Sequence, residues 1–545
     1  MKLKYFLFAA LATSAFTACE DLDTAPEGGT LTEDQKVEVG TAKPERAEAG
    51  VRGIFSQFNV YMPNYDAIGS RHNDFGYSSI MFFTDCNTED LISGDNGYNW
   101  GGNSLTYDDR PYTSRESQIL WNDYYKIIFS ANTVAGSLNA DSEDPLTQYY
   151  LGQALAARAF CYLELAQLFQ FNYKGHEKSA CVPLITNENS SKAATEGAPR
   201  ATVEDVYAQV NADLTKAIEV LGKAQKAGQK RSDRRYIDLA VAYGLRARMN
   251  LAMQNWAEAA ADAQAAIDNT DARPATINEV SKPTFCSADE PNWMWGIYIA
   301  ETDDVVSSGI VNWISHNGTF NYGYGQYSGG HQISKKLYKT IADTDIRKGW
   351  WSDDKGFCAN VSDEWNAYLQ VTFKPTDKQK AAGIVATPYL NCKFAPYQGI
   401  LNNDVNANDL PLMRVEEMYL ILAEAQHMAG QNGKSTLEQF IKTYRDPAYV
   451  CTASDVQNEV YRQKRIELWG EGRIWFDVMR LNKGVDRRGA GYEPNCVLNI
   501  PANDPILLWR LPQTEINGNS ALTDADNNPS TPVPSAVEDV DIPLQ

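Results

Sequence analysis

The sequence has little of the chemistry from which active sites are built. Only five histidines occur among its 545 residues, and they lie far apart along the chain. Patterns typical of zinc proteases, serine hydrolases, phosphate-binding loops and dinucleotide-binding turns are missing. Because catalysis needs a base, a nucleophile or a metal held together, the sequence predicts a protein that is not an enzyme and uses no cofactor.

Cysteine is also sparse, with nine residues scattered along the chain. No Cys-x-x-Cys pair occurs and no histidine lies nearby at ligand spacing, so no structural metal site is expected. A chain of this size does not need disulfides to hold its core, and we expect mostly free, buried thiols, although an exported chain could pair some of them. Beyond Cys19, these are Cys86, Cys161, Cys181, Cys286, Cys358, Cys392, Cys451 and Cys496.

Basic residues are too few to balance the acids. Lysine and arginine number 49 against 70 aspartates and glutamates, which gives a net charge of -21. A polyanion repels phosphate backbones, so nucleic acid is excluded as a partner. The same charge argues against peripheral binding to anionic lipid headgroups.

The only marked hydrophobic run at the N-terminus belongs to a secretion signal covering residues 1–18. Lys2 and Lys4 precede an apolar stretch that ends at Phe16, and small residues lead to Cys19. The stretch is too short to span a membrane. A cysteine at this place resembles the lipobox of bacterial lipoproteins, although Phe16 stands where Leu or Val is usual. The resemblance implies acylation of Cys19, and an ordinary signal peptide cut nearby is the alternative.

An acidic segment follows the cysteine. Residues 19–45 are polar and contain Gly28, Gly29 and Pro44, which suits a flexible tether. The acidic residues directly after Cys19 resemble those of surface lipoproteins of Bacteroidota. The resemblance implies a protein anchored by lipid to the outer membrane, on the cell surface.

Helical periodicity dominates residues 46–285. Apolar residues recur every three or four positions in residues 151–169 and 202–221, the second opened by a capping box. Two further helices, expected at 236–253 and 256–267, carry alanine at contact positions, which lets antiparallel helices approach closely. We interpret them as degenerate tetratricopeptide-like pairs, although any helical hairpin would use alanine this way. The predicted fold class is mainly α.

Residues 286–545 form the second predicted unit. Up to residue 411, Gly, Asn, Tyr, Trp and Ser crowd together, which indicates long loops and short strands. Strong helices are expected at 414–428 and 454–481, the latter with a capping box formed by Ser454 and Gln457. The polar tail from Asn517 is expected to lie over the surface without regular structure.

Several blocks, in order, resemble the SusD/RagB family of surface lipoproteins that partner TonB-dependent transporters in glycan uptake. The resembling segments are residues 157–162, 182–184, 202–221, 414–425, 465–480 and 511–519. In the fourth, Arg414 is followed by both Glu416 and Glu417, so the family's Arg-x-x-Glu motif can be read in either register. The resemblance implies a helical SusD-like fold and a SusC-like transporter as partner.

The charged residues of the 465–480 segment have a structural interpretation. Arg465, Glu467, Glu471, Arg473 and Arg480 are spaced for ion pairs on a helix surface or between helices, while the tryptophans and aliphatic residues among them bury. A buried acid pair acting on substrate is the alternative, but no base, nucleophile or metal ligand is grouped with it.

Two aromatic loops have the composition of a carbohydrate site. Sugars present C–H faces that stack on aromatic rings, and hydroxyls that need amide or carboxylate partners. The first loop covers residues 98–103 and the second residues 312–327, with Trp350 and Trp351 not far behind. We predict glycan contacts at Tyr98, Trp100, Asn103, Trp313, Tyr322, Tyr324 and Trp350. The alternative is that these aromatic residues are structural.

These observations lead to one functional hypothesis and two rivals. We expect a surface lipoprotein that binds oligosaccharide or polysaccharide nutrients and hands them to a SusC-like TonB-dependent transporter. The rivals are a surface glycoside hydrolase, whose acids come from distant segments, and a repeat scaffold that binds peptide or protein.

Overall fold

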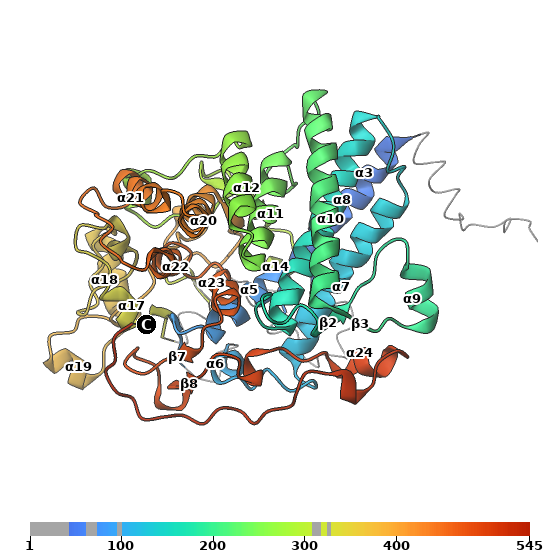
Figure 1. The fold of residues 1–545 in the computed structure, drawn as a ribbon. Coiled ribbons are helices and arrows are strands. Elements are labelled where there is room, and N and C mark those ends of the chain that lie inside the picture. Colours follow the sequence, from blue (N-terminus) through green and yellow to red (C-terminus); the bar gives the residue numbers. More distant parts are fainter. Residues whose placement is uncertain (1–42, 62–73, 95–100, 308–317, 324–328, 545) are drawn as a thin grey trace, which may run out of the picture.

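The computed structural model describes residues 43–61, 74–94, 101–307, 318–323 and 329–544. Within these ranges the chain is mainly helical, with four two-stranded sheets, which confirms the predicted fold class. Figure 1 shows long helices side by side in one half and shorter helices with loops in the other.

The long helices of the first half pack around α8. They are α3 (Ala47–Ser56), α7 (Arg115–Gly136), α8 (Pro145–Phe169), α10 (Val203–Lys226), α11 (Leu239–Met253) and α12 (Trp256–Asn269). The capping box predicted for α10 is confirmed, since Thr202 and Asp205 bond each other's backbone N–H groups. Helix α8 buries nearly its whole circumference rather than one stripe, because α7, α10, α11 and α23 all contact it.

The predicted alanine-rich pair is α11 and α12. Ala240 and Ala247 of α11 and Ala259 and Ala263 of α12 are fully buried where the two helices meet. Their small side chains let the helices approach closely, as a tetratricopeptide-like hairpin requires. Helix α12 continues this stacking onto α20 (Val415–Met428), which belongs to the second half.

The second half joins the first through a sheet and a shared core. Strand β4 (Trp293–Ile297) pairs antiparallel with β6 (Leu410–Arg414), which leads directly into α20. Behind α20 lie α21 (Gly433–Tyr444) and α22 (Val456–Glu467). One hydrophobic core has members from Val51 to Leu522 and so includes residues of both predicted halves. The division at residue 285 remains a prediction from the sequence.

The helix predicted over 454–481 is wrong as a single element. It is two helices, α22 and α23 (Ile474–Arg480), separated by Gly470 and Gly472 at φ of 75° and 68°. Only glycine adopts this left-handed conformation without strain, and a Cβ on Gly472 would lie 2.6 Å from Met81 Cα. The cap of α22 also differs, because Asp455, not Ser454, accepts the backbone N–H of Asn458.

Shorter elements complete the described fold. The helices are α5 (Tyr77–Asn87), α6 (Gly102–Thr106), α9 (Ser190–Glu196), α13 (Ile277–Val280), α14 (Asp304–Ser307), α17 (Lys335–Tyr338), α18 (Asp363–Thr372), α19 (Asp377–Ala381) and α24 (Gln513–Gly518). The remaining sheets pair β1 (Leu91–Ile92) with β5 (Gln332–Ile333), β2 (Ala180–Pro183) with β3 (Arg200–Thr202), and β7 (Val485–Asp486) with β8 (Asn499–Ile500).

The C-terminal tail lies along the body. After a 3₁₀ turn at Asp524–Asp526, it contains neither helix nor strand up to residue 544 and runs along the lower edge of the molecule in Figure 1. The backbone N–H of Val537 donates to the carbonyl of Val497 at 2.9 Å, which fixes the tail beside β8. Among the described helices, none combines the length and the apolar character that crossing a bilayer requires.

Candidate functional site

The predicted site residues fall into two groups. Cys19, Tyr98, Trp100, Trp313 and Tyr324 lie outside the residues that the structure describes, so their roles stay predictions. Asn103, Tyr322 and Trp350 are described. The described segments on either side of the two aromatic loops also show where each loop joins the body.

The first junction is the β1–β5 sheet. Leu91 pairs with Ile333 and Ile92 with Gln332, so the chain enters the first predicted loop and leaves the second from neighbouring antiparallel strands. The backbone N–H of Ser334 donates to the carbonyl of Asp90 at 2.9 Å and extends this contact. The strand before the first loop and the strand after the second, about 240 positions apart in sequence, therefore lie side by side.

A second junction lies at Asn59 and Asp303. The Asn59 amide donates to Asp303 Oδ2 at 2.8 Å, and the same carboxylate accepts the Ala300 backbone N–H at 2.9 Å. Lys126, paired with Asp123 at 2.7 Å, donates to the carbonyl of Val60 at 2.9 Å. Polar contacts thus fix the described chain at Asn59, Val60 and Asp303.

A cavity of about 550 Å³ opens beside this second junction. Its aromatic lining comes from Phe55, Phe58, Tyr236, Trp295 and Tyr298, and its polar lining includes Asn59, Asp233, Arg235, Thr302, Asp303 and Asp304. The Arg235 guanidinium carbon lies 5.0 Å from the centroid of the Tyr298 ring. Rings interleaved with amide, hydroxyl and charged groups match the needs of a sugar.

Sequence reasoning missed this cavity. Its walls come from α3, the segment before α11, strand β4 and the residues before α14, which are far apart in the chain. A signal that could have pointed to it is the aromatic composition of residues 293–298. That composition alone did not separate the buried Trp295 from the half-buried Tyr298.

Two of the described predicted residues lie at the surface. Tyr322 is 45% exposed. Its backbone N–H donates to the carbonyl of Asn403 at 3.0 Å, and its carbonyl accepts the side-chain amide of Asn406 at 3.0 Å. Asn103, exposed on α6, donates to Glu116 Oε1 at 3.0 Å. Both positions are held from behind and present polar or aromatic atoms outward.

The predicted glycan contact at Trp350 is wrong. Its side chain is 1% exposed, and its indole N–H donates to the carbonyl of Val280 at 2.8 Å. Lys393 Nζ lies 5.2 Å from the ring centroid, so a buried cation occupies the space that a sugar would need. Trp351 is equally buried, packed edge-on against Trp469.

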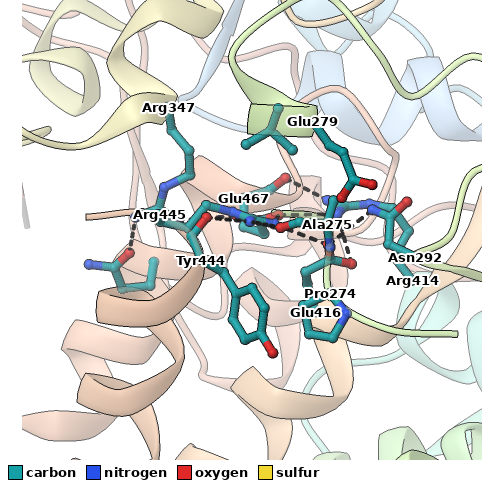
Figure 2. A network of polar contacts seen from close by, with 12 residues as sticks. Pro274, Ala275, Glu279, Asn292, Arg347, Arg414, Glu416, Tyr444, Arg445 and Glu467 are labelled. Carbon is teal, nitrogen blue, oxygen red and sulfur yellow. Dashed lines mark hydrogen bonds and ion pairs between the residues drawn. The ribbon is translucent and has the colours of Figure 1, made fainter. Parts of the chain in front are cut away.

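Behind the surface lies a buried network of ion pairs, shown in Figure 2. Arg445 bonds Glu467 Oε1 at 2.8 Å and Glu416 Oε1 at 3.0 Å, and Arg414 bonds Glu471 at 2.8 and 2.9 Å. Arg347 adds a third guanidinium at 3.3 Å from Glu467. Of the two arrangements predicted for the charged residues, on a helix surface or between helices, these ion pairs have the second, and they are buried.

The electrostatics of the network are those of fixed charges. Burial by itself would raise the pKa of Glu467, but Arg445, Arg414 and Arg347 outweigh it and hold that pKa well below its usual range. Burial lowers the pKa of Lys393 to about 8, against the opposite effect of Glu471. A carboxylate held ionised between three guanidinium groups is a fixed charge of the buried network.

The remaining charged residues of the signature segment tie it to the first half. Arg465 bonds both carboxylate oxygens of Asp90, at 2.8 and 2.5 Å, and Arg473 bonds Glu164 of α8. The Trp469 indole donates to the carbonyl of Asp90 at 2.9 Å. Both motif registers are also used, because Glu416 enters the network and Glu417 pairs with Arg248 at 2.6 Å.

Comparison with known families decides the identity. Residues 76–251 match the model described as starch-binding associating with outer membrane, and residues 298–529 match the SusD family model. The chain belongs to the SusD/RagB family. The two matched ranges follow each other in the chain and include α8, α20 and the signature helices α22 and α23.

Individual SusD-like proteins are similar over most of the chain. A SusD-like protein P2 of Formosa agariphila is 26% identical over 75% of this chain and 80% of its own. A crystal structure of a SusD-like carbohydrate binding protein from Bacteroides vulgatus superposes with a TM-score of 0.70 at 22% identity, covering 89% and 98% of the two chains. A laminarin-binding SusD-like protein has a TM-score of 0.56 at 16% identity, covering 89% and 99%.

Proposed function

We propose that this protein captures oligosaccharide or polysaccharide nutrients at the cell surface and hands them to a SusC-like TonB-dependent transporter. Membership of the SusD/RagB family supports this, as do relatives described as carbohydrate binding and laminarin binding. The binder works by stacking and hydrogen bonding, without breaking a bond.

The observation that carries the proposal is the β1–β5 pairing. This pairing places β1, which precedes the first aromatic loop, beside β5, which follows the second. We propose on this basis that the predicted contacts of the first loop, Tyr98, Trp100 and Asn103, act together with those of the second, Trp313, Tyr322 and Tyr324. Rings and amides drawn from both loops supply what a glycan requires.

We propose that the cavity beside Asn59 and Asp303 is a further part of the binding site. Tyr298 and Tyr236 offer partly exposed rings there, and Thr302 and Asp304 offer hydroxyl and carboxylate groups. A cavity of about 550 Å³ has the size of a site for a small saccharide. We infer that one or two sugar units occupy it, while the aromatic loops hold the rest of the chain.

The membrane anchor in this proposal is the acylated Cys19. Each buried methylene contributes about 0.8 kcal/mol, so two or more acyl chains hold a protein firmly at the bilayer. The high negative charge of the chain gives no electrostatic attraction to anionic headgroups. Anchoring beside the transporter raises the local concentration of bound glycan, which makes a weak site useful.

The proposal is tested by screening the purified protein against a glycan array and a peptide library. We expect binding to glycans that contain stackable sugar faces, and loss of that binding in Trp100→Ala and Trp313→Ala. Peptide binding that persists in both variants would favour a repeat scaffold. New reducing ends formed from a bound glycan, and abolished by one carboxylate substitution, would favour a hydrolase.

A further inference from the structure

A small satellite core lies apart from the main one, and two cysteines are part of it. Its buried members are Phe320, Cys358, Leu369, Phe373, Ala386, Leu390 and Cys392. Cys358 and Cys392 are 0% and 1% exposed. The segment between them carries α18 and α19, so the two cysteines stand at its opposite ends.

The backbone brings these ends together. Trp351 and Asn391 form an antiparallel bridge, and the Cys392 N–H donates to the carbonyl of Trp350 at 2.8 Å. The Cys358 thiol donates to the adjacent carbonyl, that of Gly349, at 3.2 Å. Both cysteines therefore lie against consecutive carbonyls at the end of one 3₁₀ helix, Ile346–Trp350.

Both side chains belong to the same small core and are free thiols in the structure. The Cys392 thiol donates to the carbonyl of Leu390 at 3.5 Å, and burial raises its pKa. Two cysteines of one small core that lie against adjacent carbonyls, on a backbone closed by the Trp351–Asn391 bridge, can reach disulfide geometry by a local movement. Since a buried, protonated thiol is a poor nucleophile, the reaction belongs to the stage before the satellite core closes.

We propose that Cys358 and Cys392 form a structural disulfide in the exported protein. Two S–H bonds break and one S–S bond forms, and two electrons and two protons pass to the disulfide of a thiol–disulfide oxidoreductase, which leaves as a dithiol. One thiolate first attacks that disulfide, and the second cysteine then resolves the mixed disulfide. The oxidising compartment is the part of this inference that rests on the proposed surface location.

The cross-link has a reason in the energetics of the satellite core. The described apolar core of this region is small for a segment of its length, with seven buried residues and with Val361, Trp365, Tyr368 and Leu401 packed against them. Closing a loop of about 30 residues with a disulfide restricts the unfolded chain and stabilises the folded one. Phe320 belongs to the same core and its carbonyl accepts the Asn402 N–H at 2.7 Å, so the disulfide also holds the segment that carries Tyr322.

The test uses the full chain isolated from outer membranes, quenched in acid, alkylated and digested without reductant. We expect a peptide pair joining Cys358 to Cys392 that separates when reductant is added. Reductant present during heating should lower the melting temperature of the wild-type chain by roughly 3–6 °C. Cys358→Ala, Cys392→Ala and the double variant should show equal losses and no response to reductant.

Cys161→Ala is the matched control, because Cys161 is fully buried in α8. This variant should melt lower but keep the full response to reductant. Refolding the reduced chain in a glutathione buffer separates the chemistry from the location: the linked peptide should form there too, whatever compartment the cell uses. Alkylated Cys358 and Cys392 in both preparations, with a reductant-insensitive wild-type chain, would overturn the disulfide.

Discussion

Arg465 of α22 holds both carboxylate oxygens of Asp90, the residue that directly precedes β1. The same Asp90 accepts the Trp469 indole and the Ser334 N–H on its carbonyl, each at 2.9 Å. The family's signature helix thus fixes the β1–β5 junction from behind. A motif that looks like surface charge in the sequence works as the support of the predicted binding patch.

Removing the Arg465 guanidinium should therefore be costly. Arg465→Met leaves the Asp90 carboxylate buried without its main cation, and we expect a loss of about 3–5 kcal/mol in the free energy of unfolding. Urea denaturation followed by tryptophan fluorescence measures it. The control is Arg52→Met, whose pair with Glu48 is exposed, and which should be indistinguishable from wild type. Equal midpoints for the two variants would contradict the supporting role of Arg465.

Glu467 predicts a pH dependence. Its pKa is lower in the folded protein than in the unfolded chain, so its ionisation stabilises the fold above the unfolded value of about 4.3. This stabilisation is lost as the pH falls below that value. Glu467→Gln should cost about 3–5 kcal/mol at pH 7 and show a weaker loss of stability from pH 5 downward than wild type. Unfolding curves at pH 7, 5 and 4 test this, and parallel pH profiles of the two proteins would argue against it.

Gly472 should not tolerate a side chain. Gly472→Ala combines a left-handed φ of 68° with a Cβ placed 2.6 Å from the backbone of Met81. We expect a loss of at least about 1–3 kcal/mol from strain, with the clash in addition. Gly228→Ala is the control, because Gly228 has a φ of 91° but open space around it. The difference in urea midpoint between these variants measures the clash alone. Equal midpoints would mean that the turn between α22 and α23 moves enough to accommodate the Cβ without cost.

Substitutions at Trp350 and Tyr322 should have separate effects, the first on stability and the second on glycan binding. Trp350→Ala removes a buried ring and its bond to Val280, which costs about 3–5 kcal/mol. Trp350→Phe, the milder change, should lower the melting temperature and leave glycan affinity unchanged. Tyr322→Ala should do the opposite, with affinity at least about tenfold lower and the melting temperature nearly unchanged. Calorimetric titration and thermal unfolding of the same samples decide, and weaker glycan binding by a folded Trp350→Phe would restore the original prediction.

The proposed lipid anchor at Cys19 predicts that glycan binding and membrane location can be separated. Cys19→Ala should bind glycan in solution as wild type does, because the role proposed for this residue is attachment alone. The same variant should leave the membrane fraction and impair glycan uptake by cells. Retention of the variant in washed outer membranes would show that another contact anchors the protein.

Much of the fold was predictable because apolar spacing reports burial directly. The helices at 151–169 and 202–221 and the alanine-rich hairpin follow from periodicity, and the family motifs fixed their order. The break at Gly470–Gly472 was missed because apolar spacing continues through it, although the two glycines are themselves a sign of a break. The close approach of Met81, which leaves no room for a Cβ at Gly472, comes from a distant segment and has no local sign.

The site was less predictable, for a related reason. Whether an aromatic ring faces solvent depends on what packs over it, and Trp350 is covered by Val280 and Lys393, which no local pattern connects to it. Composition grouped Trp350 with Tyr322, although one is buried and the other exposed. The cavity beside Asn59 and Asp303 joins residues 244 positions apart, so only the folded chain reveals it.

The most direct test of the proposed function is a calorimetric titration of the purified protein with the oligosaccharide selected on a glycan array. We predict saturable binding to wild type, an affinity at least about tenfold weaker in both Trp100→Ala and Trp313→Ala, and an unchanged affinity in Trp350→Phe. Binding that is equally strong in all four proteins, or glycan binding absent from the wild type, would contradict capture by the paired aromatic loops.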